Sequence, residues 1–152
     1  MRRKLLALTL LASLPVEAMA DRAFCESLQG LTAAAQSRFD WLPHTGRNVA
    51  GSIEERRGVV QSVSGQPHGI YYAVMARHDP RQQPDPIRER FAALQREVGQ
   101  CLPDASFLGV TEGQGGAQAN WQTQYARIGL RRVDGGGELA QSLVEISIAS
   151  RW

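Results

Sequence analysis

The residues of this chain that could carry acid–base chemistry are its three histidines, and one of them stands beside an acid. His78 is followed by Asp79, and a histidine next to a carboxylate is a common pair in general acid–base catalysis. Adjacent residues on an extended chain point apart, and His44 and His68 fall in turn-like segments. Nothing in the spacing of the three requires convergence on a metal ion. We therefore expect solvated histidines, no metal site and no cofactor.

Two glycine-rich segments also lack the features of ligand-binding loops. Residues 112–116 lack the lysine of a phosphate-binding loop and the strand-to-helix context of a dinucleotide site. Asp134 and Glu138 flank three glycines without the alternating oxygen ligands of a calcium loop. No common hydrolase motif is present. The sequence therefore identifies no catalytic residue. If the protein is an enzyme, we expect a noncontiguous site around His78, Asp79 and the first glycine-rich segment.

The two cysteines, Cys25 and Cys101, have a structural explanation. A nucleophilic thiol needs a nearby base, and zinc ligands are spaced more closely than these two residues. An even number of cysteines is typical of a disulfide in an exported protein. We expect a Cys25–Cys101 bond, which would close a loop of about 77 residues and stabilise the fold by about 4.5 kcal/mol on the chain-entropy model.

The first twenty residues predict export. A basic start precedes a short apolar run, and a small-residue cleavage site ends at Ala20, before Asp21. The apolar run covers about ten residues, whereas a membrane-spanning helix needs about 20. We expect residues 1–20 to be a signal peptide and residues 21–152 to form a single α+β domain. The domain would be periplasmic or secreted, with no stable membrane insertion after cleavage.

The charge balance argues against a nucleic-acid partner. The chain has 17 Lys and Arg against 15 Asp and Glu, but three of the basic residues and one acid lie in the first twenty positions. The remaining 14 of each leave residues 21–152 without net charge and without a basic field for a phosphate backbone. Lys4 is the only lysine, so lysine catalysis is excluded after cleavage.

Two amphipathic segments must position the cysteines. Apolar side chains recur every three or four positions from residue 21 to 42 and from 85 to 101, which predicts two helices. Asp21 and Asp85 are the expected N-caps, the second with Pro86 at the first helical position. Antiparallel packing would bring the cysteines together, because one lies near the start of the first helix and the other near the end of the second.

Strand-like segments occupy much of the remaining chain. Apolar runs and period-two alternation predict strands over residues 59–63, 70–77, 106–110, 124–133 and 143–151. Residues 65–69 would form a hairpin turn and residues 112–116 a flexible loop. We expect a small two-layer α+β domain, with an antiparallel sheet of four to five strands and two helices on one face, in the order α-β-β-α-β-β(-β).

A candidate binding surface lies on the predicted strand 124–133. Tyr125, Arg127 and Arg131 alternate on one side of it, and tyrosine and arginine are frequent anchors of protein interfaces. Alternatively, Arg127 or Arg131 pairs with Glu145 across the strands, which would contribute under about 1 kcal/mol. We expect Trp121 to fill the core.

These observations favour a protein-binding function. Export, small size, a disulfide and the lack of a catalytic motif are typical of a non-enzymatic binding module, such as an inhibitor or an immunity-like protein. Its partner would be another exported or envelope protein. The alternatives are a small envelope hydrolase and an accessory component of an envelope or secretion assembly.

Overall fold

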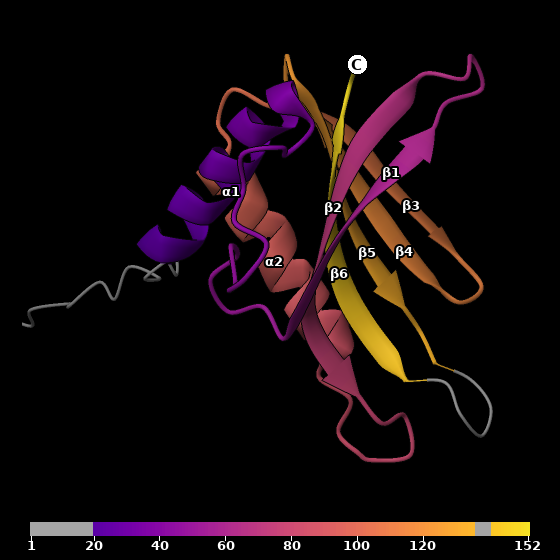
Figure 1. The fold of residues 1–152 in the computed structure, drawn as a ribbon. Coiled ribbons are helices and arrows are strands. Elements are labelled where there is room, and N and C mark those ends of the chain that lie inside the picture. Colours follow the sequence, from indigo (N-terminus) through magenta and orange to yellow (C-terminus); the bar gives the residue numbers. More distant parts are fainter. Residues whose placement is uncertain (1–19, 136–140) are drawn as a thin grey trace, which may run out of the picture.

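The computed structural model describes residues 20–135 and 141–152. This part contains two α-helices, a short 3₁₀ helix and one six-stranded antiparallel sheet with the strand order β1-β2-β6-β5-β4-β3 (Figure 1). None of its helices is long and apolar enough to cross a membrane. The elements are α1 (Arg22–Ala34), η1 (Ala35–Ser37), β1 (Glu54–Gln61), β2 (Pro67–His78), α2 (Ile87–Cys101), β3 (Ser106–Gly113), β4 (Gly116–Gln122), β5 (Ala126–Val133) and β6 (Ser142–Ser150).

The expected α+β class is confirmed, but the described sheet has six strands instead of four or five. The missed strand is β4, whose inward side chains are Ala117, Ala119 and Trp121. Two alanines give a weak apolar alternation, although Trp121 is buried as expected. The predicted flexible loop is a tight turn between β3 and β4. Gly116 there has φ 152°, and a Cβ would collide with the Arg132 carbonyl oxygen.

The first helix ends at Ala34, well before the predicted end at Leu42. The chain continues as η1, and Arg38 and Phe39 then have positive φ values of 54° and 67°. This left-handed turn places Phe39 fully in the core. Gly69 of β2 makes room for it, because a Cβ at that position would lie 2.8 Å from the Arg38 carbonyl oxygen. The periodicity thus identified a buried residue but not the path of the backbone.

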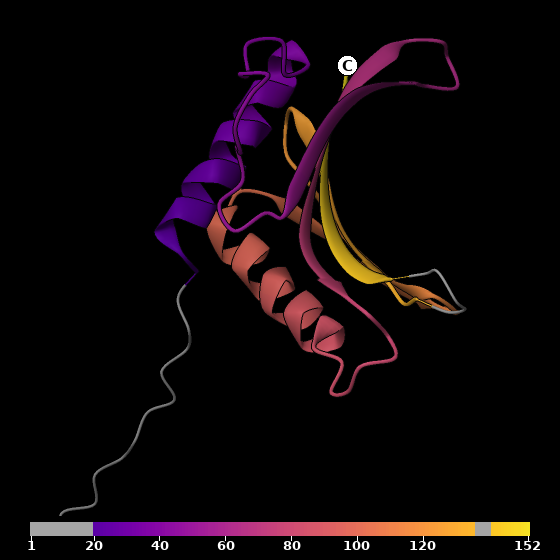
Figure 2. The same cartoon turned by 60° about the horizontal axis from the view of Figure 1, so that its bottom comes forward.

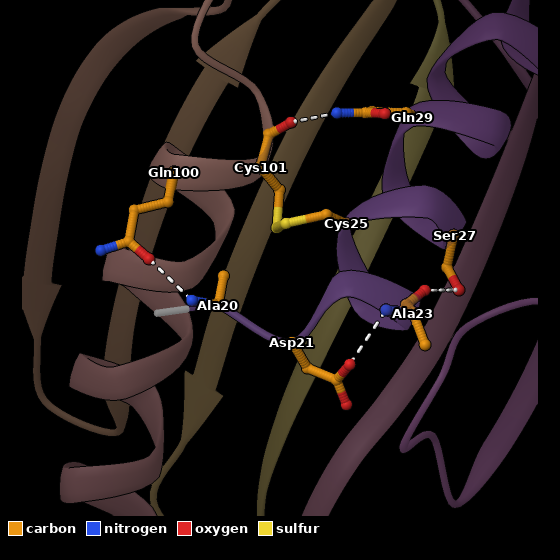
Figure 3. The surroundings of a disulfide bond; sticks show 8 residues. All are labelled: Ala20, Asp21, Ala23, Cys25, Ser27, Gln29, Gln100 and Cys101. Carbon is orange, nitrogen blue, oxygen red and sulfur yellow. Dashed lines mark hydrogen bonds between the residues drawn. A yellow bond between two sulfur atoms is a disulfide. The ribbon is translucent and has the colours of Figure 1, made fainter. Parts of the chain in front are cut away.

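The Cys25–Cys101 disulfide is present, with Cα atoms 4.6 Å apart. The expected antiparallel packing is wrong: the helices meet at an angle, with the end of α2 beside the start of α1 (Figures 1 and 2). Figure 3 shows two flanking hydrogen bonds, from Gln29 Nε2 to the Cys101 carbonyl (2.9 Å) and from the Ala20 amide to Gln100 Oε1 (3.0 Å). The disulfide therefore joins the helices at one corner.

Both predicted capping residues accept a backbone hydrogen bond. Asp21 accepts the amide of Ala23, and Asp85 accepts the amide of Ile87, each at 2.9 Å. Pro86 is the residue that precedes the first turn of α2, so this helix begins one position later than predicted. The side-chain chemistry of both helix starts was therefore readable from the sequence.

Strands β1 and β2 form the predicted hairpin with different limits. Strand β1 begins at Glu54 and ends at Gln61, and Gln61 pairs with Pro67. His68, predicted in the turn, lies within β2. The charged start of β1 hid its strand character, because β1 is an edge strand and edge strands commonly carry charged residues.

The two faces of the sheet differ completely in their surroundings. Both helices cover one face, where alternate strand residues join the helices in one buried apolar cluster. We call the other side the open face. In Figure 2 the long strands bend away from the helices at both ends, so the open face is concave along the strands.

Candidate binding surface

The centre of the open face is a buried carboxylate held between two arginines. Glu145 of β6 is 3% exposed, although it alternates with core residues and points away from the helices. Arg131 Nη2 on β5 donates to Glu145 Oε1 at 3.0 Å, and Arg56 Nη2 on β1 donates to Oε2 at 2.8 Å. The Arg56 guanidinium also lies over the ring of Tyr72, 4.5 Å from its centroid. Glu145 thus links strands from both halves of the sheet.

Both guanidinium groups keep donors available to a ligand. The side chains of Arg56 and Arg131 are 55% and 52% exposed. Each uses one N–H group on Glu145, whereas a guanidinium has five donors in a planar fork. Such forks match the carboxylate groups of a partner well. We call Arg56, Glu145 and Arg131 the Glu145 triad. It presents two oriented cationic groups to solvent.

A polar hollow of about 470 Å³ opens beside Arg131. Gln118 and Asn120 of β4 line it, and Gln118 Nε2 donates to Asn120 Oδ1 at 2.9 Å. Gly129 pairs with Asn120 and is closely surrounded, because a Cβ there would lie 2.8 Å from Ser147 Oγ. The amide and guanidinium groups make this end of the open face suitable for hydrogen bonding.

Arg127 borders a second hollow, of about 370 Å³, at the other end of the open face. The β1–β2 hairpin and the end of β6 supply its other walls, including Val60 and Ser150. Among the described residues, Arg127 has no ion pair, whereas Arg131 pairs with Glu145. Of the two cross-strand pairings that the sequence allowed, the structure contains the one to Arg131.

Tyr125 lies apart from the two arginines. It sits in the bend before β5, is half-buried, and meets Trp152 edge-on with ring centroids 6.0 Å apart. Its side chain lines a third hollow, of about 570 Å³, together with Ala33 of α1 and Leu102 after α2. The predicted surface is therefore divided. Arg127 and Arg131 share the open face, whereas Tyr125 lies on the side of the sheet that the helices cover, which we call the helix side.

A polar cluster that the sequence analysis did not identify lies where the loop after η1 meets β1. Glu55 accepts the amides of Asn48 and Val49 at 2.8 Å each, the hydroxyl of Ser52 at 2.6 Å, and the phenol of Tyr71. Asn48 Nδ2 donates to Tyr71 Oη at 2.9 Å. No spacing in the sequence predicts this arrangement, because the loop path brings these residues together.

Hydrogen bonding controls the charge state of this cluster. Burial would raise the pKa of Glu55, but hydrogen bonds from Asn48, Ser52, Tyr71 and Val49 outweigh it and lower that pKa below its ordinary value. Burial and the hydrogen bond to Glu55 raise the pKa of Tyr71 to about 12. Four donors occupy the carboxylate, which leaves no free lone pair to accept a substrate proton. The cluster therefore anchors the loop.

His44 lines a hollow of about 250 Å³ beside this cluster, together with Arg57 of β1. The Arg57 guanidinium contacts the His44 ring and donates to the carbonyls of Phe39 (2.8 Å) and Leu42 (3.3 Å). A guanidinium has donors only, so the facing ring nitrogen accepts. Arg57 thus ties the end of the η1 region to the sheet.

The residues of the enzyme hypothesis have separate partners. His78 Nε2 donates to the Gln82 carbonyl at 2.9 Å, and Asp79 accepts from Arg81 Nη2 at 2.7 Å. Hydrogen bonds from Arg81 lower the pKa of Asp79 to about 2. The β3–β4 turn joins strands that lie three and four positions from β2 in the sheet, about 14 Å or more at ordinary strand spacing. The fold does not gather these groups into one site.

Within residues 20–135 and 141–152, no group of three or more His, Cys, Asp or Glu side chains lies close enough to hold a metal ion. The segment between Asp134 and Glu138 falls mostly on residues 136–140, outside the described residues. Asp134 itself pairs with Arg132 at 2.8 Å.

The chain gives no match to protein-family models, to curated proteins or to solved structures.

Proposed function

We propose that this protein is an exported, non-enzymatic module that binds another exported or envelope protein through its open face. Arginine and tyrosine are enriched in protein interfaces and among their strongest anchors. Arg56, Arg127, Arg131 and Tyr72 supply both residue types to one concave surface. An inhibitor or an immunity-like protein would use such a surface on a rigid scaffold.

The observation that carries the proposal is the pair of guanidinium groups fixed on Glu145. Ordered side chains lose less conformational entropy when a partner binds. A buried carboxylate is costly, and apolar residues often replace a buried ion pair without loss of stability. The stability of the fold therefore does not explain why Arg56, Arg131 and Glu145 stand on this surface. Recognition of an acidic partner would use the remaining N–H donors of the two arginines.

Export is part of the proposal. The Cys25–Cys101 disulfide fits an oxidising compartment. Residues 1–19 lie outside the described residues, so the proposed signal peptide needs a direct test. Intact-mass measurement of the periplasmic and secreted fractions should give a chain that starts at Asp21, cleaved after Ala20. A full-length product in the inner membrane would overturn this part.

Capture from a periplasmic extract tests the open face. The wild type is compared with Arg127→Ala/Arg131→Ala and with Arg96→Ala, which replaces an exposed arginine on α2. The wild type and the Arg96→Ala control should capture the same partner, and the double variant should lose it. Equal capture by all three would contradict the proposal. Substrate turnover that His78→Ala abolishes would replace it with the hydrolase alternative.

Tyr125→Ala provides an independent comparison. Because Tyr125 lies on the helix side, its replacement should leave capture unchanged if the open face alone binds the partner. Loss of capture by Tyr125→Ala with full capture by Arg127→Ala/Arg131→Ala would move the interface to the helix side. Purification in a stable multiprotein complex would favour the accessory-component alternative.

A further inference from the structure

The tip of the β1–β2 hairpin carries apolar side chains that are left uncovered in the described structure. Val63 is fully exposed, Val59 is 71% exposed and Val60 is 45% exposed. Residues 58–67 contain no charged side chain, although 21% of the whole chain is charged. Single apolar residues are normal on a protein surface. Val59 and Val60 are adjacent in β1, so their side chains point to opposite faces of the sheet, and Val60 shares the open face with Arg56. Val60 and Val63 at the tip therefore expose apolar surface that gains free energy when it is covered.

Hydrogen bonds fix the shape of this tip. The Ser62 amide donates to the Gln66 carbonyl at 2.9 Å, and the Gln66 amide donates to Ser62 Oγ at 3.1 Å. The Gly65 amide donates to the Ser62 carbonyl at 2.9 Å, and Gly65 has φ 79°, which favours glycine. Such a preorganised turn loses little entropy on binding.

The hairpin tip lies at one end of the open face, where it can contact a partner bound there. The hairpin projects past the neighbouring strands (Figures 1 and 2), and the ladder between β2 and β6 begins at Ile70. At the root of the hairpin, Val60 and Arg127 line the same hollow of about 370 Å³. A partner on the open face would therefore meet the hairpin.

We propose that the tip is an insertion element, in which Val63 enters an uncharged apolar pocket of the partner protein with Val60 of the open face beside it. Arg127 would contact the polar rim of that pocket. This inference rests on the proposed function. The tip matches an uncharged pocket, because valines would desolvate a charged pocket without compensating hydrogen bonds.

A protein pocket suits the tip better than a lipid surface. Segments that bind at the membrane interface combine apolar residues with tryptophan, tyrosine, lysine or arginine, and residues 58–67 contain none of these four. The serines and glutamines around Val63 instead resemble the hydrogen-bonding rim of a protein contact.

Site-specific photocrosslinking in the full exported chain tests the insertion. A photoreactive benzoyl-phenylalanine is placed at position 63 and, as a control, at position 96 on α2. Position 63 should form one crosslinked species with the captured partner, and position 96 should form none. Val63→Asp should weaken binding of the purified partner at least about tenfold, and Val63→Ile should retain it. Unfolding should be unchanged in both, because Val63 is fully exposed.

The outcomes separate this inference from the proposed function. If Val63→Asp binds normally and Arg127→Ala/Arg131→Ala does not, the insertion is wrong and the open-face interface stands. If neither change affects binding, both proposals fail. A crosslink at twice the mass of the chain would assign the tip to a second copy. Crosslinking to phosphatidylglycerol vesicles without a partner would assign it to a lipid surface, and either result overturns the insertion.

Discussion

The molecule holds two carboxylates in opposite ways. Glu55, near the helix side, receives two backbone amides, one hydroxyl and one phenol. Glu145, on the open face, accepts hydrogen bonds from two long arginine side chains that remain about half-exposed. Each group that donates to Glu55 has a single N–H or O–H, which the carboxylate already occupies, whereas the guanidinium groups that donate to Glu145 have several N–H groups left.

This difference separates holding the fold from presenting a surface. Backbone amides fix the Glu55 region to one loop path, and they cannot turn toward water when the carboxylate is removed. Arg56 and Arg131 can turn toward water, so the Glu145 triad contributes less to stability and more to recognition. Changes on the helix side should therefore reduce stability, and changes on the open face should reduce binding.

The largest loss of stability is expected on removal of the disulfide. Replacing both Cys25 and Cys101 by serine frees a long loop in the unfolded chain and should lower the free energy of unfolding by about 2–5 kcal/mol. Urea unfolding followed by tryptophan fluorescence measures the loss. Partner affinity under folding conditions should be unchanged. If the double serine variant bound the partner more weakly but kept full stability, the assignment of stability to the helix side and binding to the open face would be wrong.

A smaller loss is expected for Glu55→Ala. The change leaves the amides of Asn48 and Val49 without their acceptor and should cost about 2–4 kcal/mol in unfolding free energy. The matched control is Glu54→Ala, which removes an adjacent, half-exposed carboxylate paired with Arg77 and should cost under about 1 kcal/mol. Similar losses in the two variants would contradict the role assigned to Glu55.

The same cluster should make stability depend on pH at both extremes. The pKa of Glu55 is lowered in the folded protein, so its contribution is present above the unfolded-state pKa and is lost as pH falls through the folded-state pKa. The pKa of Tyr71 is raised to about 12, so its contribution is present below about pH 10 and is lost as pH rises toward 12. Tyr71→Phe should remove the alkaline loss in denaturant unfolding measured from pH 8 to 12.

A smaller loss of stability than for Glu55→Ala is expected for Glu145→Gln. The amide keeps the shape of the side chain, and the two arginines can be solvated, so the cost should be about 1 kcal/mol. Partner affinity should nevertheless fall, because Arg56 and Arg131 lose their fixed orientation. A loss of stability as large as that of Glu55→Ala would remove the contrast between the two carboxylates.

Local patterns in the sequence predicted much of the fold. Cysteine number, helix periodicity and strand alternation identified the disulfide, both helices and five of the six described strands. Strand β4 was missed because alanines occupy two of its core positions. The end of α1 was missed because a left-handed turn at Arg38 keeps Phe39 in the core. Tertiary packing determines both features, and neither strand alternation nor helical periodicity reveals them.

The candidate surface was predicted only in part, for a related reason. Alternation placed Arg127 and Arg131 together correctly because both lie within β5. It failed for Tyr125, which precedes the strand. Arg56 was missed because the predicted strand began at residue 59, and its contact with Glu145 joins strands 89 positions apart in the chain. Long-range contacts of this kind have no signal in one sequence.

The central claim is that the open face binds the partner while the helix side maintains the fold. Calorimetric titration of the purified captured partner with Arg127→Glu, beside Arg96→Glu as the control, tests it most directly. Arg127→Glu should bind at least about tenfold more weakly, with an unchanged midpoint of thermal unfolding, because Arg127 has no ion pair among the described residues. Arg96→Glu should bind like the wild type. Equal affinities for the two variants would contradict the account.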